Sequence, residues 1–193
     1  MILYHGTDAR SAQNIKEKGI DLLKGGVNLD FGQGFYTTPD LQKARARARF
    51  KAHFNDKAAY IVEIEVDESA LRKLNYKVFK ETDIAWGNFI INNRCGIKIA
   101  NVNIAYPDHN LDQKYDVIEG EIADGTVSTV AYNLRQNAVK LSMFDYRDIL
   151  TSNQKSYGKQ ISFHTEAALS CIKSIKCNNI DIYERLIYMK GSE

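Results

Sequence analysis

Three short segments contain residue types that could bind a ligand and take part in its chemistry. They are Tyr4-His5-Gly6-Thr7, Gly34-Phe35-Tyr36-Thr37-Thr38 and Gln160-Ile161-Ser162-Phe163-His164-Thr165. A neutral histidine ring offers a nitrogen to a hydroxyl, and a glycine lets a ligand approach the backbone N–H and C=O closely enough to bind an amide. A tyrosine ring offers a flat face for stacking on a heterocycle.

Each segment also has an ordinary structural explanation when it is taken alone. His5 fits a solvated histidine at a strand end, and Tyr36 fits an aromatic strand residue of the core. Gln160 and His164 are four residues apart, so on a strand their side chains point to the same face. His164 fits a site residue and a polar residue at a strand end equally well.

Helices and strands with clear signals surround these segments. Residues 59–66 alternate with period two, which is typical of a half-buried strand, and Asp8 and Gly19 fit the two ends of a helix. We expect further strands at 2–4, 35–38, 115–123, 159–164 and 180–189, and further helices at about 39–53 (capped by Thr38), 83–93, 126–141 and after Thr165. This order is not a regular βαβ alternation, so we predict an α+β fold with split, antiparallel-rich sheets flanked by helices.

Composition and length limit the class of protein. The 193 residues, 44% of them hydrophobic and 26% charged, fit one globular domain over residues 1–193. The longest apolar runs, such as residues 89–91, are far shorter than the roughly 20 residues of a membrane span, and the N-terminus lacks the pattern of a signal peptide. Three cysteines without a CxxC pair predict reduced thiols in a cytoplasmic protein, and four scattered histidines predict no metal site.

A basic segment follows the second motif. Residues 43–51 contain five bases and no acid, although the whole chain has a net charge of only +2. On a helix, Arg45 and Arg49 share one face and Lys43 and Arg47 share another, while alanines at every fourth position form a small buried stripe. The segment fits a solvated helix face, and it also fits a contact to phosphate groups.

The ordered set of motifs resembles the NAD-binding half of the ADP-ribosyltransferases, in the branch with a His-Tyr-Glu triad that includes diphtheria toxin and the poly-ADP-ribose polymerases. A narrower resemblance is to a little-characterised bacterial family of the same fold, DUF3990, and it spans about residues 2–172. It rests on the sequence DFGQGFYTT at 30–38, on Trp86, on Asn93-Arg94, and on residues 115–120 with 123–124 and 160–165.

This resemblance implies a role for each motif residue. His5 would bind the adenosine-side ribose of NAD, the Gly6 backbone would hold the nicotinamide carboxamide, and Tyr36 would stack on the nicotinamide ring. The glycine-bearing loop 25–34 would cover the cofactor. The residues implied to contact NAD are His5, Gly6, Thr7, Gly34, Phe35, Tyr36 and Arg45.

The third triad position falls on Gln160, where better-known members carry glutamate. Cleavage of the nicotinamide–ribose bond passes through a cationic state, which a carboxylate stabilises and a neutral amide does not. Loss of such an interaction typically costs ~3–4 kcal/mol, or about 100- to 1,000-fold in rate. The reaction is then slow, or a neighbouring acid (Glu166, Asp116 or Glu119) supplies the charge, or the domain binds NAD without transfer. We expect an active enzyme, because the narrower family pattern itself has glutamine here.

The resemblance therefore predicts a mono-ADP-ribosyltransferase that uses NAD and no metal and modifies a macromolecular acceptor. By the same resemblance it fits a toxin of a toxin–antitoxin or phage-defence pair, with an antitoxin protein as partner. Arg94, Asp116 and His164 are auxiliary or acceptor-binding candidates. Two alternatives stay open, a catalytically silent NAD- or ADP-ribose-binding module and an RNA 2′-phosphotransferase. The acceptor could be protein, RNA or DNA.

Overall fold

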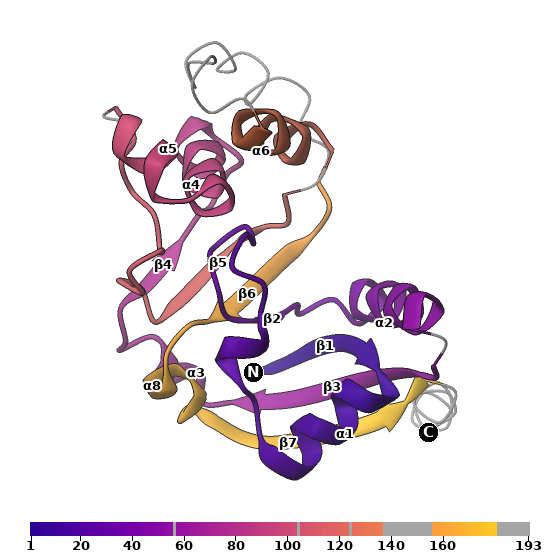
Figure 1. Cartoon of the computed structure of the whole chain (residues 1–193). Helices are drawn as coiled ribbons and strands as arrows, with labels where there is room; N and C mark the ends of the chain where they lie inside the picture. Colours follow the sequence, from indigo (N-terminus) through magenta and orange to yellow (C-terminus); the bar gives the residue numbers. More distant parts are fainter. Residues whose placement is uncertain (56, 104, 124, 137–155, 181–193) are drawn as a thin grey trace.

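A computed structural model describes residues 1–55, 57–103, 105–123, 125–136 and 156–180. Its strands form two mostly antiparallel sheets flanked by helices, so the predicted α+β class is confirmed (Figure 1). The first sheet has the order β1-β3-β7, from β1 (Ile2–Asp8), β3 (Ala59–Val66) and β7 (Ile172–Asn179). The second has the order β2-β6-β5-β4, from β2 (Phe35–Thr37), β6 (Lys159–Phe163), β5 (Val117–Glu121) and β4 (Tyr76–Val78). Its β4–β5 pair is parallel.

The first helix follows β1 without a loop. Asp8 accepts a hydrogen bond from the Ser11 N–H at 2.9 Å and so caps α1 (Ala9–Lys18), as predicted. Gly19 ends the helix with φ 81°, a backbone conformation that side chains disfavour. Strand β1 is longer than predicted and carries the whole of the first motif. His5, Gly6 and Thr7 therefore lie within a strand rather than beyond its end.

The second helix, α2 (Leu41–Asn55), begins later than predicted. Asp40 caps it, because its Oδ1 accepts hydrogen bonds from the N–H groups of Gln42 (2.8 Å) and Lys43 (3.2 Å). Thr38 was expected to be the cap, but its hydroxyl donates to the Lys159 carbonyl at 2.8 Å and its backbone pairs with Tyr4. The expectation was wrong because Thr38 joins the strands that flank it.

Alanines let α2 lie very close to the first sheet. Ala44, Ala48 and Ala52 are buried, which confirms the predicted small stripe. A Cβ on Gly6 would lie 1.9 Å from the Ala44 carbonyl oxygen, so only glycine fits beneath the helix at this point.

The two sheets meet through backbone hydrogen bonds and a shared core. The N–H of Tyr4 donates to the Thr38 carbonyl and the N–H of Thr38 donates back, both at 2.9 Å. One core cluster contains Leu3 and Ile64 from the first sheet and Phe163 from the second. A second cluster packs the buried Trp86 and other side chains of α4 (Ile84–Cys95) against α6 (Thr126–Gln136).

The remaining elements are short. They are η1 (Leu22–Lys24), α3 (Glu68–Leu71), α5 (Ile97–Val102) and α8 (Glu166–Leu169). The predicted helix 126–141 is confirmed to residue 136, and its last residues lie outside the described ones. The predicted strand 180–189 also lies outside them, apart from Ile180. Within the described ranges, no helix has both the length and the apolar character to cross a membrane.

Candidate functional site

A cleft of about 1270 Å³ opens where β1 meets β2. His5, Gly6, Tyr36 and Gln160 all line it, although Gln160 follows Tyr36 by more than a hundred residues in sequence. Thr7, Gly34 and Phe35 line the same cleft. The fold thus brings the three sequence motifs to one cavity.

His5 is held as a neutral ring with one nitrogen left to accept. Its Nδ1 lies 2.7 Å from the Tyr36 carbonyl oxygen, which can only accept, so Nδ1 carries the proton and donates it. Burial lowers the pKa of His5 to about 4, with Lys51 and Arg47 adding to the effect. Within the described residues no donor reaches Nε2. This nitrogen can therefore accept a hydrogen bond from a ligand hydroxyl at neutral pH.

Gly6 presents backbone groups to the same side of β1. In an antiparallel strand successive residues direct their N–H and C=O to opposite edges, so residues two apart share an edge. Tyr4 directs these groups toward Thr38, so Gly6, two residues on, directs its own toward that outer edge, away from β3. This edge lies at the cleft, where an amide could pair with it.

Tyr36 contributes a fixed ring rather than a reactive hydroxyl. The hydroxyl donates to the Gly32 carbonyl at 2.6 Å and accepts from the Phe31 N–H at 2.9 Å. Its ring lies nearly parallel to that of Phe31, with centroids 6.4 Å apart. Burial raises the pKa of Tyr36 well above its usual value, and the charge of Asp30 adds to this shift. Both hydrogen-bonding functions of the hydroxyl are thus used within the chain, and the ring suits a stacking role.

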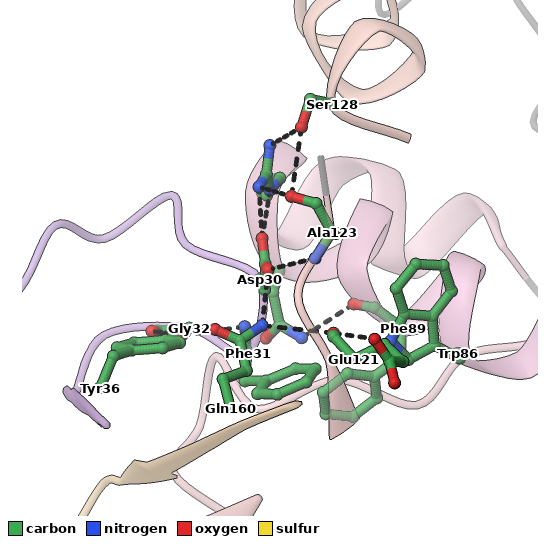
Figure 2. A network of polar contacts seen from close by, with 12 residues as sticks. Asp30, Phe31, Gly32, Tyr36, Trp86, Phe89, Glu121, Ala123, Ser128 and Gln160 are labelled. Atoms are coloured by element: carbon green, nitrogen blue, oxygen red, sulfur yellow. Dashed lines mark hydrogen bonds and ion pairs between the residues drawn. The ribbon is translucent and has the colours of Figure 1, made fainter. Parts of the chain in front are cut away.

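Gln160 belongs to a polar network that sequence reasoning missed (Figure 2). Its Nε2 donates to Asp30 Oδ2 at 2.7 Å and, at 3.4 Å, to the Glu121 carbonyl. Asp30 Oδ2 also accepts from the Ala123 N–H at 2.9 Å, and Asp30 Oδ1 accepts from Arg94 Nε at 2.7 Å and from Arg94 Nη2. Asp30, Arg94 and Gln160 line the cleft, so a buried carboxylate lies next to the third triad position.

Arg94, an auxiliary or acceptor-binding candidate in the sequence, pairs with the carboxylate of Asp30. Besides Asp30, its guanidinium donates to Ser128 Oγ at 2.8 Å and to the Ala123 carbonyl at 3.0 Å. These contacts fix Arg94 at the end of α4. Its main role within the chain is to hold Asp30.

His164 and Asp116 have structural partners. His164 Nδ1 donates to the Gln33 carbonyl and Nε2 lies beside Ser162 Oγ, both at 2.8 Å, and burial lowers the pKa of His164 to about 4. His164 lines the cleft, but both ring nitrogens are used. Asp116 accepts from Thr165 Oγ1 at 2.6 Å and from the Asn75 N–H at 3.0 Å, and it does not line the cleft.

The neighbouring acids considered as sources of charge are placed differently. Glu119 accepts from the Tyr76 hydroxyl and pairs with Arg72, and its neighbour Gly120 is the residue opposite Gln160. Glu119 therefore does not reach the cleft. Glu166 is exposed and lies at the cleft. The acid in contact with Gln160 is Asp30, which had not been considered.

A row of cations from α2 forms one wall. Lys43, Arg47 and Lys51 line the cleft, whereas Arg45 does not. The three lie four residues apart, so they share one helix face over about 12 Å. The resemblance implied that Arg45 contacts NAD, but Arg45 lies on another face of the helix. Lys43, Arg47 and Lys51 fit this role better. As for metals, the described residues contain no group of three or more histidine, cysteine or acidic side chains that could hold an ion.

A family model described as a protein of unknown function, DUF3990, matches residues 1–174. The chain belongs to this family. The match covers all of the cleft motifs, from β1 to the start of β7. No curated protein and no solved structure gives a significant match.

Proposed function

We propose that this DUF3990 protein binds NAD in the cleft, breaks its nicotinamide–ribose bond and transfers ADP-ribose to a macromolecular acceptor. The observation that carries the proposal is the meeting of His5, Gly6, Tyr36 and Gln160 in one cleft. Each presents a group of the required kind: a neutral nitrogen, a strand edge, an aromatic ring and an amide. The cleft volume of about 1270 Å³ leaves ample room for a dinucleotide.

Each part of NAD has a counterpart in the cleft. His5 Nε2 accepts from a ribose hydroxyl, and the Gly6 edge pairs with the carboxamide of nicotinamide. The Tyr36 ring packs against the pyridine ring. The pyrophosphate lies toward Lys43, Arg47 and Lys51, whose charges complement it.

The reaction breaks the C–N bond between ribose and nicotinamide, and nicotinamide leaves with the bonding electrons. The ribose carbon becomes cationic and accepts an electron pair from a nucleophile of the acceptor, which releases its proton. No nucleophile of this chain takes part. Gln160 holds a ribose hydroxyl, and the Asp30 carboxylate, one hydrogen bond away, places negative charge near the cation.

A second candidate function is binding of NAD or ADP-ribose without transfer. It is favoured by the ion pair between Arg94 and Asp30, which offsets the negative charge beside Gln160. Both functions include binding of the ligand, but only transfer releases nicotinamide. Isothermal titration with NAD together with an assay of released nicotinamide separates them.

The proposal predicts that the protein releases nicotinamide from NAD and that His5→Ala or Tyr36→Ala lowers this release by about 100-fold or more. His53→Ala and Tyr132→Ala are matched controls, because both side chains are exposed and lie outside the cleft. These controls should keep wild-type turnover. The proposal is rejected if the protein does not bind NAD and releases no nicotinamide with any cell lysate as acceptor.

The acceptor class is found with radiolabelled NAD and whole-cell lysate. Digestion of the labelled products with nuclease or protease shows whether ADP-ribose is attached to nucleic acid or to protein. Loss of label with His5→Ala links the modification to the cleft.

A further inference from the structure

We infer that Asp30 is a positioning residue that turns the amide of Gln160 so that its carbonyl oxygen faces the cleft. The inference rests on the proposed function for its catalytic meaning. The contact between Asp30 and Gln160, however, can be tested without NAD. The pair also accounts for the glutamine at a position where a carboxylate is expected.

The orientation of the Gln160 amide follows from its neighbours. One end of the amide contacts Asp30 Oδ2 at 2.7 Å and the Glu121 carbonyl oxygen at 3.4 Å. Both neighbours can only accept, so this end must be the NH₂ group. The opposite end is then the carbonyl Oε1. Within the described part of the chain no donor occupies Oε1, and Gln160 lines the cleft.

Asp30 is itself held rigidly enough to impose this orientation. Its side chain is 7% exposed, and donors from three sides surround the carboxylate: Arg94, the Ala123 N–H and Gln160. Arg94 is in turn held by Ser128 and the Ala123 carbonyl. These contacts hold the carboxylate with Oδ2 toward Gln160 (Figure 2).

The pair contains one carboxylate and one amide joined by a hydrogen bond. A glutamate at 160 with an asparagine at 30 would contain the same two groups in exchanged places. In both arrangements an acceptor oxygen from position 160 can face the cleft, and the amide donates to the carboxylate. The protein thus keeps a carboxylate at the site, displaced by one hydrogen bond toward Arg94.

Exchange of the carboxylate and the amide can be tested with a double-mutant cycle. Its four proteins are the wild type, Asp30→Asn, Gln160→Glu and the double variant. In Asp30→Asn the side-chain amide of Gln160 can flip, because the new amide at position 30 both donates and accepts hydrogen bonds. In Gln160→Glu two carboxylates meet and compete for one proton. The double variant restores one carboxylate, one amide and the hydrogen bond between them, whereas the Ala123 N–H loses the carboxylate oxygen that accepts from it in the wild type.

Nicotinamide release measures the catalytic consequence. We expect kcat to fall about 100-fold in Asp30→Asn, with a much smaller change in KM, since misplacement of a reacting group by about 1 Å has effects of this size. Gln160→Glu should add an ionisation to the pH profile of kcat. The double variant should lose that ionisation and regain at least about tenfold in kcat over either single variant.

The matched control is Asp67→Asn, which makes the same change at the cap of α3, away from the cleft. It should keep wild-type kcat. A kcat for Asp30→Asn within about threefold of wild type, or a double variant no better than the worse single variant, would overturn the inference.

A second measurement is independent of NAD and of turnover. The side-chain NH₂ of Gln160, followed by NMR, should exchange with solvent at least about tenfold more slowly in wild type than in folded Asp30→Asn, because the hydrogen bond to Asp30 protects it. Equal exchange rates would overturn the inference. If wild type shows protection but releases no nicotinamide and binds no NAD, the proposed function fails while the positioning contact stands. If Asp30→Asn does not fold, slow exchange in the double variant supports the inference and fast exchange opposes it.

Discussion

At the scale of single residues, two histidines are held neutral by the same device. In both His5 and His164, Nδ1 donates to a backbone carbonyl, and burial lowers the pKa to about 4. The two rings differ at Nε2. In the proposed role of His5, Nε2 accepts a hydrogen bond from a ligand hydroxyl, whereas Nε2 of His164 lies beside Ser162 Oγ. His5 therefore presents Nε2 for its proposed role, whereas His164 fixes the glycine loop to the end of β6.

His164 makes stability depend on pH. The unfolded chain takes up a proton on this ring below about pH 6.5, whereas the folded protein does so only near pH 4. Stability is therefore full above pH 6.5 and falls as the pH drops from 6.5 toward 4. We expect the difference in unfolding free energy between pH 7.5 and pH 5 to be about 2 kcal/mol smaller in His164→Asn than in wild type.

Urea titrations at the two pH values measure this difference. His53→Asn, a change at an exposed histidine, should keep the wild-type pH dependence. An unchanged pH dependence in His164→Asn would show that the ring is not the source.

The sequence predicted some site residues and missed others for a physical reason. His5, Tyr36 and Gln160 lie in recognisable local patterns, and each lines the cleft. Asp30 and Arg94 were part of a family pattern, but their contact joins positions 64 residues apart. No local spacing indicates that pairing, because it depends on how the glycine loop folds over the end of α4.

At the scale of elements, local capping signals predicted well where no other strand competed for the cap. Asp8 caps the helix expected of it, and the helix predicted at 83–93 forms as α4. Thr38 does not, because its groups pair with Tyr4 and Lys159, which are remote in sequence. Strand β7 was not predicted, since its sequence IKSIKCNN lacks a period-two pattern and its side chains are mostly half-buried.

The cation row of α2 leads to a prediction about ligand binding. Lys43, Arg47 and Lys51 line the cleft, and among the described residues none of the three has an ion-pair partner. Arg47→Gln should weaken NAD binding about tenfold, as expected for the loss of one charge-assisted contact to phosphate. The loss should shrink at high salt, because salt screens the lost interaction.

Titration calorimetry at two salt concentrations measures the effect. Arg10→Gln removes the same charge from the exposed side of α1 outside the cleft and should leave affinity unchanged. Equal NAD affinities of wild type and Arg47→Gln would show that α2 does not bind the phosphates through Arg47.

At the scale of the whole molecule, the two sheets share one core. The cluster around Leu3, Ile64 and Phe163 takes side chains from both sheets, and the Tyr4–Thr38 bridge joins them. The cleft forms at this junction, so its geometry depends on both sheets being folded. We therefore expect the chain to unfold as one cooperative unit.

Two thiols, the half-buried Cys95 and the buried Cys171, test this cooperativity because they belong to different clusters. Cys95 packs against the α4–α6 cluster, where burial raises its pKa to about 11, and Cys171 belongs to the cluster shared by the sheets, where burial also raises its pKa. Only the thiolate reacts quickly, so both should resist alkylation at pH 8 in the folded protein. In a urea series, peptide mass spectrometry should find Cys95 and Cys171 labelled over the same transition. Labelling of Cys95 while Cys171 stays protected would show that the helices around Trp86 unfold first and that the core shared by the sheets is stable without them.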